Sequence, residues 1–474
     1  MSIWPPIVDI ADSVNSGSVS ARSLVEKSLK LIEEHQEFKT IVSDLRENSL
    51  KRADEIDQKI KKGEKLGRLA GVPFIAKDNF LVFGADTTAS SNMLKGFSAP
   101  YQATAIEKLE KEGAICVAKA NLDAFAHGSS TENSDFFTTL NPVDKTRDPG
   151  GSSGGSAASI ALDMVPFSLG TDTGGSIRLP ASFCGVVGYK PTYGLVSRSG
   201  VVAMASSLDV IGPITKSVED TALVLDCMAG KDELDGTTID RDESSYFDLN
   251  KIDLNKTKVG IVKEFFDDGL DEGVKKVILQ KVETLKSQGV EVVEVSIPSI
   301  KLALPVYYVL CPAELSSNLS RYDGQRYGFS DETAKNLDES YNKSRSIGFG
   351  DEAKRRIMLG TYVLSSGYYD AYYQKAQLVR TKLIKEFEQA FKKCNFLIGP
   401  TAPVTAFKIG ENTSDPLQMY LMDVMTVASN LVGVPSISIP AGNSDSLPVG
   451  FQIMAPQKSD KALLEFSKSV EDIN

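Results

Sequence analysis

The sequence predicts an α/β protein with one central β-sheet covered by helices, and two observations carry that prediction. Short apolar runs that suit buried strands alternate along the chain with longer amphipathic stretches that suit helices. The 474 residues are 42% hydrophobic and 24% charged, a balance that supports a large buried core. We expect one large domain over residues 1–474, although this length also accommodates two or three average domains.

Two helices are expected in the N-terminal segment, residues 1–65. Apolar residues recur on one helical face over 20–35, and Ser20 is placed to cap that helix with its side-chain oxygen. A second helix is expected over about 40–62, because Gly63 follows as a stop signal.

Strands and helices are then expected to alternate around the sheet. Long helical stretches lie at 274–288 and 352–393. The polar and acidic residues 231–257 are expected to form a solvated surface loop. This loop would connect a core segment, 66–220, with a C-terminal half, 258–474. The short apolar runs that suit buried strands are 71–76, 114–118, 164–169, 259–262, 290–295, 396–398 and 436–439.

Two glycine-rich loops each carry a serine, and a lysine ends the first apolar run of the core segment. Ser152 lies in the loop 149–156, Ser176 lies in the loop 170–178, and the lysine is Lys77. Glycine neighbours let a substrate approach a serine closely, and free N–H groups in such loops can stabilise an oxyanion. A serine hydroxyl is a weak nucleophile until a base takes its proton.

Histidine is almost excluded as that base. His35 and His127 both precede the Gly-x-Ser-x-Gly match at 150–154, whereas an α/β-hydrolase needs its histidine after the serine. Neither glycine loop continues into the Lys-Ser or Lys-Thr pair of a phosphate-binding loop, and no His/Cys cluster has zinc-ligand spacing. Lys77 is the best remaining candidate, because burial can lower its pKa and keep it neutral.

Both features also have ordinary interpretations. A Gly-Ser stretch such as 150–156 is most often a flexible linker, and a strand-end lysine is most often a solvated charge. The apolar segments around 150–156 and the ordered second loop argue against these interpretations here.

Composition favours an enzyme of the cytoplasm. Five cysteines without C-x-x-C spacing indicate reduced thiols, and residues 1–6 lack the basic and apolar parts of a signal peptide. No apolar run reaches the ~18 residues that a membrane span needs. The net charge of −11 argues against broad binding to a nucleic-acid backbone, but allows a nucleic acid held mainly by a partner.

The chain resembles the amidase signature family over nearly its whole length. The resemblance implies a mixed β-sheet covered by helices on both faces, and a Ser-Ser-Lys catalytic triad. The matching motifs lie in order between residues 71 and 213, and they include 149–158, 170–180, 183–188, 190–194 and 206–209.

This resemblance also implies the role of each residue. Ser176 would be the nucleophile, Ser152 the bridging serine and Lys77 the base, with a cis peptide bond between Gly151 and Ser152. The oxyanion hole would consist of the backbone N–H groups of Thr173, Gly174, Gly175 and Ser176.

The C-terminal half resembles, within this family, the glutaminase subunits of tRNA-dependent amidotransferases. This implies that Arg356 holds the carboxylate of free glutamine, Asp423 holds its ammonium group and Tyr307 lines the pocket. An arginine fork matches a carboxylate in a bidentate manner. The matching stretches are 307–324, 354–357, 360–377 and 419–440.

The same resemblance implies a heterotrimer in which this chain releases ammonia from glutamine without a cofactor or metal of its own. A B subunit would bind most of the tRNA and would use ATP and Mg²⁺ to convert Glu-tRNA(Gln) into Gln-tRNA(Gln). A small C subunit would wrap the pair. The acidic charge of this chain agrees with tRNA contacts that lie mainly on the partner.

Two positions depart from the expected pattern. Leu179 stands where these subunits more often have glutamine, and His127 stands where an apolar residue is expected. Because Leu179 is more typical of stand-alone amidases, an amidase for a small or fatty amide remains an alternative. A non-catalytic scaffold with this fold is a second alternative, which the intact Lys77, Ser152 and Ser176 oppose.

Overall fold

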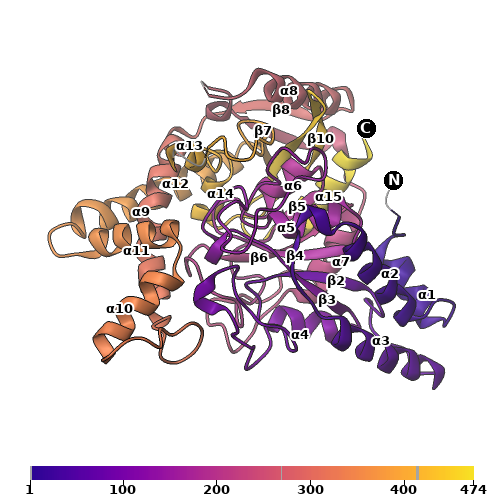
Figure 1. Ribbon diagram of the computed structural model, residues 1–474. Coiled ribbons are helices and arrows are strands. Elements are labelled where there is room, and N and C mark those ends of the chain that lie inside the picture. Colours follow the sequence, from indigo (N-terminus) through magenta and orange to yellow (C-terminus); the bar gives the residue numbers. More distant parts are fainter. Residues whose placement is uncertain (1–2, 268, 413–415, 474) are drawn as a thin grey trace.

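The computed structural model describes residues 3–267, 269–412 and 416–473, and one eleven-stranded β-sheet runs through them (Figure 1). The strands are β1 (Ile41–Asp44), β2 (Pro73–Lys77), β3 (Ile115–Ala120), β4 (Phe167–Asp172), β5 (Val187–Lys190), β6 (Val210–Thr215), β7 (Lys258–Val262), β8 (Glu291–Val295), β9 (Phe396–Pro400), β10 (Ser436–Ser444) and β11 (Leu447–Met454). Their order across the sheet is β1-β3-β2-β4-β6-β5-β10-β11-β9-β7-β8.

The sheet is mixed. The strands β3, β2 and β4 pair in parallel on one side, and β9, β7 and β8 pair in parallel on the other. Between these two groups, the neighbours from β4 through β6, β5, β10 and β11 to β9 are antiparallel. The α/β class with a mixed sheet, which the sequence predicts, is confirmed.

Helices pack against the sheet and extend beyond it. In Figure 1 the N-terminal helices lie beside β2 and β3, whereas α9, α10 and α11 project from the opposite side. The longer helices are α1 (Ile7–Asn15), α2 (Ala21–Glu34), α3 (Arg46–Lys61), α4 (Thr104–Lys111), α5 (Gly154–Ala161), α7 (Val218–Met228), α8 (Glu272–Ser287), α9 (Ala303–Asn318), α10 (Leu337–Gly348), α11 (Asp351–Leu364), α12 (Lys375–Phe391) and α15 (Asp460–Asp472). The shorter helices are α6 (Arg178–Cys184), α13 (Pro416–Leu421) and α14 (Val427–Val432).

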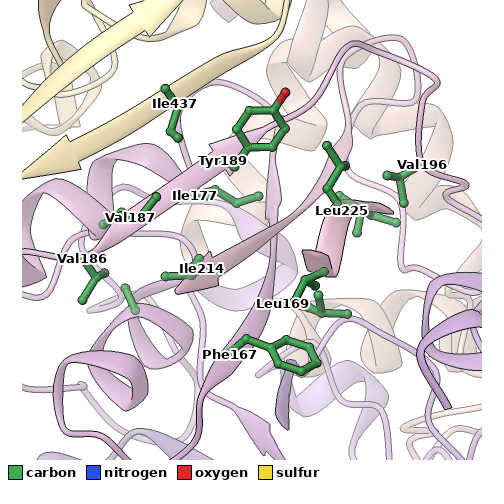
Figure 2. Close-up of a cluster of buried hydrophobic side chains, with 14 of the residues drawn as sticks. Phe167, Leu169, Ile177, Val186, Val187, Tyr189, Val196, Ile214, Leu225 and Ile437 are labelled. Atoms are coloured by element: carbon green, nitrogen blue, oxygen red, sulfur yellow. The ribbon is translucent and has the colours of Figure 1, made fainter. Parts of the chain in front are cut away.

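A buried apolar core surrounds the middle of the sheet. In Figure 2 side chains from β4, β5, β6, β10 and α7 meet around Ile177, which follows the second glycine loop. Because Ile177 is fully buried there, the core fixes one end of that loop.

Several sequence predictions are confirmed. The helix expected at 20–35 is α2, and the Ser20 hydroxyl accepts a hydrogen bond from the N–H of Ser23 as expected of a cap. The helix expected at 274–288 is α8, and each of the seven apolar runs overlaps a strand.

Other predictions of local structure are wrong at specific residues. The expected helix at 40–62 begins with the edge strand β1, because 41–44 pairs with β3. The stretch 352–393 is broken after α11, where Gly367 has a φ of 87°. The strands β5, β6 and β11 were not predicted, since glycine, proline and polar residues interrupt their apolar pattern and only tertiary pairing selects them.

Residues 231–257 contain no strand in the structure, and several of them bind the body of the protein. Asp232 Oδ2 accepts hydrogen bonds from Thr104 Oγ1 and Ser197 Oγ, and the Tyr246 ring is fully buried. No helix in the described parts of the chain combines the length and apolar character needed to cross a membrane.

A glycine sets the distance between α9 and α11. A Cβ on Gly360 would lie 1.9 Å from the carbonyl oxygen of Pro312, so alanine there forces the helices apart. We expect Gly360→Ala to reduce the free energy of unfolding by about 1–3 kcal/mol, as overpacking typically does. Urea unfolding measures this. Gly236→Ala is the matched control, because nothing lies within 4 Å of its Cβ position. Equal stability of the two variants would contradict the prediction.

Candidate active site

The parallel pair β2 and β4 brings the lysine and the two serine loops together. Neighbouring parallel strands end at the same edge of a sheet, so Lys77 at the end of β2 lies beside Thr171 near the end of β4. The loop 149–153 leads into α5 at this edge, and the loop 173–177 leads from β4 into α6. All of these residues belong to the buried part of the molecule.

Lys77 is in direct contact with Ser152. The Lys77 amine lies 2.8 Å from Ser152 Oγ, 2.9 Å from Ser153 Oγ and 2.9 Å from Thr171 Oγ1. The Ser153 hydroxyl donates to the Thr171 carbonyl oxygen at 3.2 Å, so it is engaged elsewhere and accepts from Lys77. Three hydroxyl groups therefore hold the amine in one position, and Ser152 is the one that lies on the glycine loop.

Burial makes Lys77 suitable as a base. The side chain is completely buried, and this desolvation lowers the pKa of Lys77 from 10.5 to about 7. The buried carboxyl groups of Asp123, Asp172 and Asp209 act in the opposite direction and limit the shift. A substantial fraction of Lys77 is thus neutral at pH 7 and can accept a proton.

A backbone hydrogen bond connects Ser176 to the loop that carries Ser152 and Ser153. The N–H of Ser153 donates to the carbonyl oxygen of Ser176 at 3.1 Å, and the peptide bond between Gly151 and Ser152 is cis. Ser176 is 8% exposed, unlike the fully buried Ser152. Its hydroxyl forms no hydrogen bond to any residue that the structure describes. The structure thus joins Lys77 directly to Ser152 and leaves the hydroxyl of Ser176 free.

The loop 173–176 presents free donors. No residue within the described ranges accepts a hydrogen bond from the four backbone N–H groups of this loop. Thr426 Oγ1 donates to the Gly174 carbonyl oxygen at 2.6 Å, and Thr173 Oγ1 donates to Asp209 at 2.7 Å. A Cβ on Gly175 would lie 2.2 Å from Thr426 Oγ1, so only glycine allows this close approach. Free N–H groups in a fixed loop can stabilise an oxyanion.

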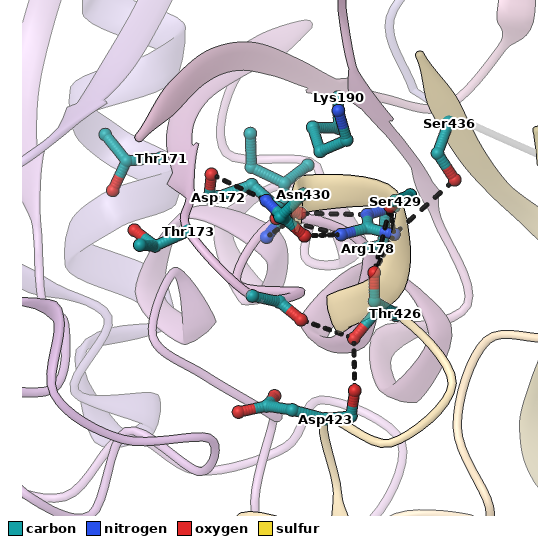
Figure 3. Close-up of polar contacts among 12 residues, drawn as sticks. Thr171, Asp172, Thr173, Arg178, Lys190, Asp423, Thr426, Ser429, Asn430 and Ser436 are labelled. Atoms are coloured by element: carbon teal, nitrogen blue, oxygen red, sulfur yellow. Dashed lines mark hydrogen bonds and ion pairs between the residues drawn. The ribbon is translucent and has the colours of Figure 1, made fainter. Parts of the chain in front are cut away.

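A buried ion pair anchors both ends of this loop (Figure 3). Arg178 Nε and Nη2 donate to the two carboxylate oxygens of Asp172 at 3.0 and 2.9 Å. Arg178 also donates to Asn430 Oδ1 and to Gln452 Oε1, both at 2.7 Å. Although burial opposes a charge at Asp172, Arg178 lowers the pKa of this carboxyl to about 2. The loop is thereby tied to the C-terminal half of the chain.

Arg356 lies in a second part of the site, and only its Nε has an acceptor among the described residues. It is 3% exposed, its Nε donates to Glu352 Oε1 at 2.8 Å, and its guanidinium lies against the rings of Tyr308 and Tyr420. Neither Nη group has an acceptor among residues 3–267, 269–412 and 416–473. The two outer donors are therefore available to a carboxylate of a ligand.

Asp423 and Tyr307 border the glycine loop. Asp423 Oδ1 lies 3.4 Å from the Cβ position of Gly175, and the Tyr307 ring lies 2.9 Å from that of Gly174. Burial raises the pKa of Asp423 to about 7, against the effect of the Arg356 charge and a hydrogen bond from Ser129. The structure thus places Asp423 and Tyr307 directly beside the loop that carries Ser176.

The two departures from the family pattern differ in position. Leu179 is fully buried in a small apolar cluster with Phe183 and Phe407, and it lines no described cavity near the loops. His127 instead lines a cavity of about 290 Å³ together with Arg356 and Tyr420. Both residues nevertheless lie close to the site, because the N–H of Leu179 donates to the carbonyl oxygen of Gly175 at 2.8 Å.

Sequence reasoning missed several supporting residues. Thr171 and Ser153 hold the Lys77 amine, and Asn79 Nδ2 donates to Thr171 Oγ1 at 3.1 Å. Thr171 and Ser153 belong to the segments that the sequence already singled out, and Asn79 lies two residues after Lys77, so their closeness in sequence to the candidate residues was a usable signal. The partners of Arg178 in α14 and β11 are more than 240 residues away in the sequence, and no local pattern reveals them. No group of three potential metal ligands forms within the described ranges.

The chain belongs to the amidase family, whose model matches residues 23–464. Like that family it is an amidase-signature enzyme, and the lysine and two serines of the typical triad are present. It is 51% identical to the A subunit of glutamyl-tRNA(Gln) amidotransferase from Thermoanaerobacter pseudethanolicus, over 99% of this chain and 96% of that protein. The corresponding protein of Carboxydothermus hydrogenoformans is 50% identical over 98% and 96% of the two chains.

Solved structures agree with this assignment. The crystal structure of the glutamyl-tRNA(Gln) amidotransferase A subunit from Thermotoga maritima is 40% identical, with a TM-score of 0.78 over 95% of this chain and 91% of that chain. A bacterial aryl acylamidase of the amidase signature family matches with a TM-score of 0.88 over 99% and 96% of the chains. Because it is only 24% identical, it supports the fold alone.

The lowered pKa of Lys77 predicts the pH dependence of amide hydrolysis. If neutral Lys77 is the base, kcat/KM rises with pH through about 7 and levels off above it, since deprotonation creates the active form. The profile is measured with butanamide, which has no ammonium group, so that ionisation of Asp423 does not affect the binding of substrate. Lys77→Arg should be inactive, because a guanidinium stays protonated. A flat profile between pH 6 and 9 would refute the role of Lys77.

Proposed function

We propose that this protein is the glutamine-hydrolysing subunit of a tRNA-dependent amidotransferase. The two outer nitrogens of Arg356, which have no acceptor among the described residues, are the observation that carries the proposal. The Arg356 charge acts on the buried Asp423, and Asp423 in turn borders the loop that carries Ser176. A ligand carboxylate, a ligand ammonium group and a serine nucleophile would therefore find their partners close to one another. Free glutamine has both charged groups, and a simple amide has neither.

The proposed reaction assigns each step to a residue. Ser176 Oγ attacks the amide carbon of the glutamine side chain, and its proton passes through Ser152 to neutral Lys77. The N–H groups of 173–176 stabilise the oxyanion, the C–N bond breaks, and ammonia leaves with the returned proton. Water then hydrolyses the acyl-enzyme to glutamate by the same relay. The distance of 2.8 Å between Lys77 Nζ and Ser152 Oγ supports a proton relay through Ser152.

Glutamine fits the electrostatics of the pocket. Arg356 offers two parallel donors, which match the geometry of a carboxylate. Asp423 is available for the ammonium group, because Ser129 is the donor to its Oδ2 and the arriving positive charge favours its ionised form. Both groups are buried, so each becomes more effective when the ligand excludes water.

The remaining steps belong to partner subunits in this proposal. A B subunit binds the tRNA, uses ATP and Mg²⁺ to activate the glutamate on Glu-tRNA(Gln), and receives the ammonia; a small C subunit completes a cytoplasmic heterotrimer. The relatives that match over nearly the full chain are named as the A subunit of such an enzyme, which supports the assembly. The net charge of −11 supports tRNA contacts on the partner.

Removal of the nucleophile should separate the two half-reactions. We expect Ser176→Ala to abolish glutamine-dependent amidation by the assembled enzyme, whereas amidation with added ammonium chloride persists, because Ser176 acts only in ammonia release. Formation of Gln-tRNA(Gln) with each nitrogen donor measures this. Wild-type glutaminase activity in the variant would show that another residue is the nucleophile.

The role of Arg356 in carboxylate binding is tested by comparing glutamine with an uncharged amide as substrate. Charge-assisted hydrogen bonds contribute about 1.5–3 kcal/mol, so Arg356→Ala should raise the KM for glutamine roughly 10- to 150-fold. The loss on butanamide should be at least 10-fold smaller than the loss on glutamine. Lys354→Ala, which changes an exposed cation on the same helix, is the control. Equal losses on both substrates would assign Arg356 to the fold and would favour a stand-alone amidase.

A further inference from the structure

The side chain of His127 is completely buried without a hydrogen-bond partner. Neither Nδ1 nor Nε2 contacts a polar group of the described residues, although the backbone of His127 is fully engaged. Its N–H donates to the carbonyl oxygen of Ala124 at 3.0 Å, and its carbonyl oxygen accepts from Asn133 Nδ2 at 2.7 Å. Buried polar groups in native proteins nearly always have partners, so the two ring nitrogens call for a ligand or an ordered water.

The backbone before His127 holds the ring in a fixed place. Phe125 and Ala126 have φ values of 53° and 65°, a left-handed conformation that residues with side chains rarely adopt. The Phe125 ring packs between Tyr322 and Phe349, at centroid distances of 5.3 and 5.4 Å, and contacts the His127 ring at 6.1 Å. Such strained backbone persists where packing over-determines it, and it concentrates at functional sites.

His127 lines a cavity of about 290 Å³, through which a ligand can reach its ring nitrogens. Arg356 lines the same cavity with its two outer donors unoccupied, and Glu132 lines it with an unpartnered Oε2. Burial together with the nearby Arg356 charge holds the pKa of His127 well below its ordinary value, so the ring is neutral and has one donor and one acceptor. A zwitterionic amino acid satisfies more of these atoms than an anion alone.

We propose that His127 is a specificity-determining residue whose ring N–H donates a hydrogen bond to the substrate carboxylate held by Arg356. A carboxylate accepts about four hydrogen bonds, and the arginine fork uses two of them. His127 supplies a third donor from a rigid position, so a substrate with an α-carboxylate gains an interaction that an uncharged amide lacks. This inference rests on the proposed glutaminase function and adds a residue to its carboxylate subsite.

The test compares His127→Phe with His127→Gln. Phenylalanine preserves the ring contact with Phe125 and removes both nitrogens, whereas glutamine retains a donor and an acceptor. The substrates are L-glutamine and 4-aminobutanamide, which keeps the amine and the amide of glutamine but lacks its carboxylate. His35→Phe is the matched control, because His35 lies at the end of α2 and does not line this cavity.

We expect His127→Phe to raise the KM for glutamine at least 10-fold with a smaller change in kcat, as the loss of a hydrogen bond to a charged group predicts. The loss on 4-aminobutanamide should be at least 5-fold smaller. His127→Gln should recover most of the glutamine KM. Equal losses on both substrates, or an unchanged glutamine KM, would overturn the proposal and leave His127 as a contact to cavity water.

Binding of L-glutamate, measured by calorimetry, separates this inference from the proposed function. Glutamate has the same α-carboxylate and needs no turnover. If wild type does not hydrolyse glutamine but binds glutamate at least 10-fold more tightly than His127→Phe, the glutaminase proposal fails and the role of His127 stands. If wild type hydrolyses glutamine and both proteins bind glutamate equally, the inference about His127 fails alone.

Discussion

The buried ion pair between Asp172 and Arg178 is the interaction on which the geometry of the site depends. Both side chains are fully buried, and such charges are tolerated only when they are paired and hydrogen-bonded. The pair closes the glycine loop at both ends, while the remaining donors of Arg178 reach α14 and β11. The guanidinium of Arg178 thus fixes the position of the loop and its free N–H groups relative to the C-terminal half, which carries Asp423.

Lys77 is also buried, but unlike Asp172 and Arg178 it has no partner of opposite charge in direct contact among the described residues. Three hydroxyl groups surround its amine instead. Hydroxyls can accept from an amine without fixing its positive charge, so desolvation dominates and the pKa falls to about 7. In contrast, the amine of Lys119 on the neighbouring strand β3 lies 2.9 Å from the carboxylate of Asp78, and both side chains are completely buried. The two buried lysines on adjacent strands therefore have different surroundings: hydroxyl groups surround the amine of Lys77, and a carboxylate contacts the amine of Lys119.

Two residues of the proposed pocket come from the part of the chain that projects from the sheet. Arg356 lies on α11 and Tyr307 on α9, and Gly360 lets these two helices approach closely. The loops that carry Ser152 and Ser176 instead adjoin the sheet, as do the segments that carry His127 and Asp423. The same fold can therefore serve amidases of other specificity, since α9 and α11 can change while β2, β4 and their loops remain.

The sequence by itself determined the α/β class and most strands, and it singled out Lys77, Ser152 and Ser176 as candidate reactive residues. Those predictions rest on local patterns: apolar runs, serines among glycines, and a lysine that follows a strand. It also singled out His127, but only as a departure from a pattern. The missed strands β5, β6 and β11 carry mixed polar and apolar residues, and pairing across the sheet selects them.

Only the tertiary structure decided which polar groups are satisfied. Residues that are distant in the sequence decide that Arg178 is paired. They also decide that the outer nitrogens of Arg356 and the ring nitrogens of His127 have no partner among the described residues. The same holds for Leu179, whose side chain packs into a small apolar cluster with Phe183 and Phe407. Burial and hydrogen bonding are properties of the three-dimensional surroundings, so the same residue types could have been ordinary surface charges in another fold.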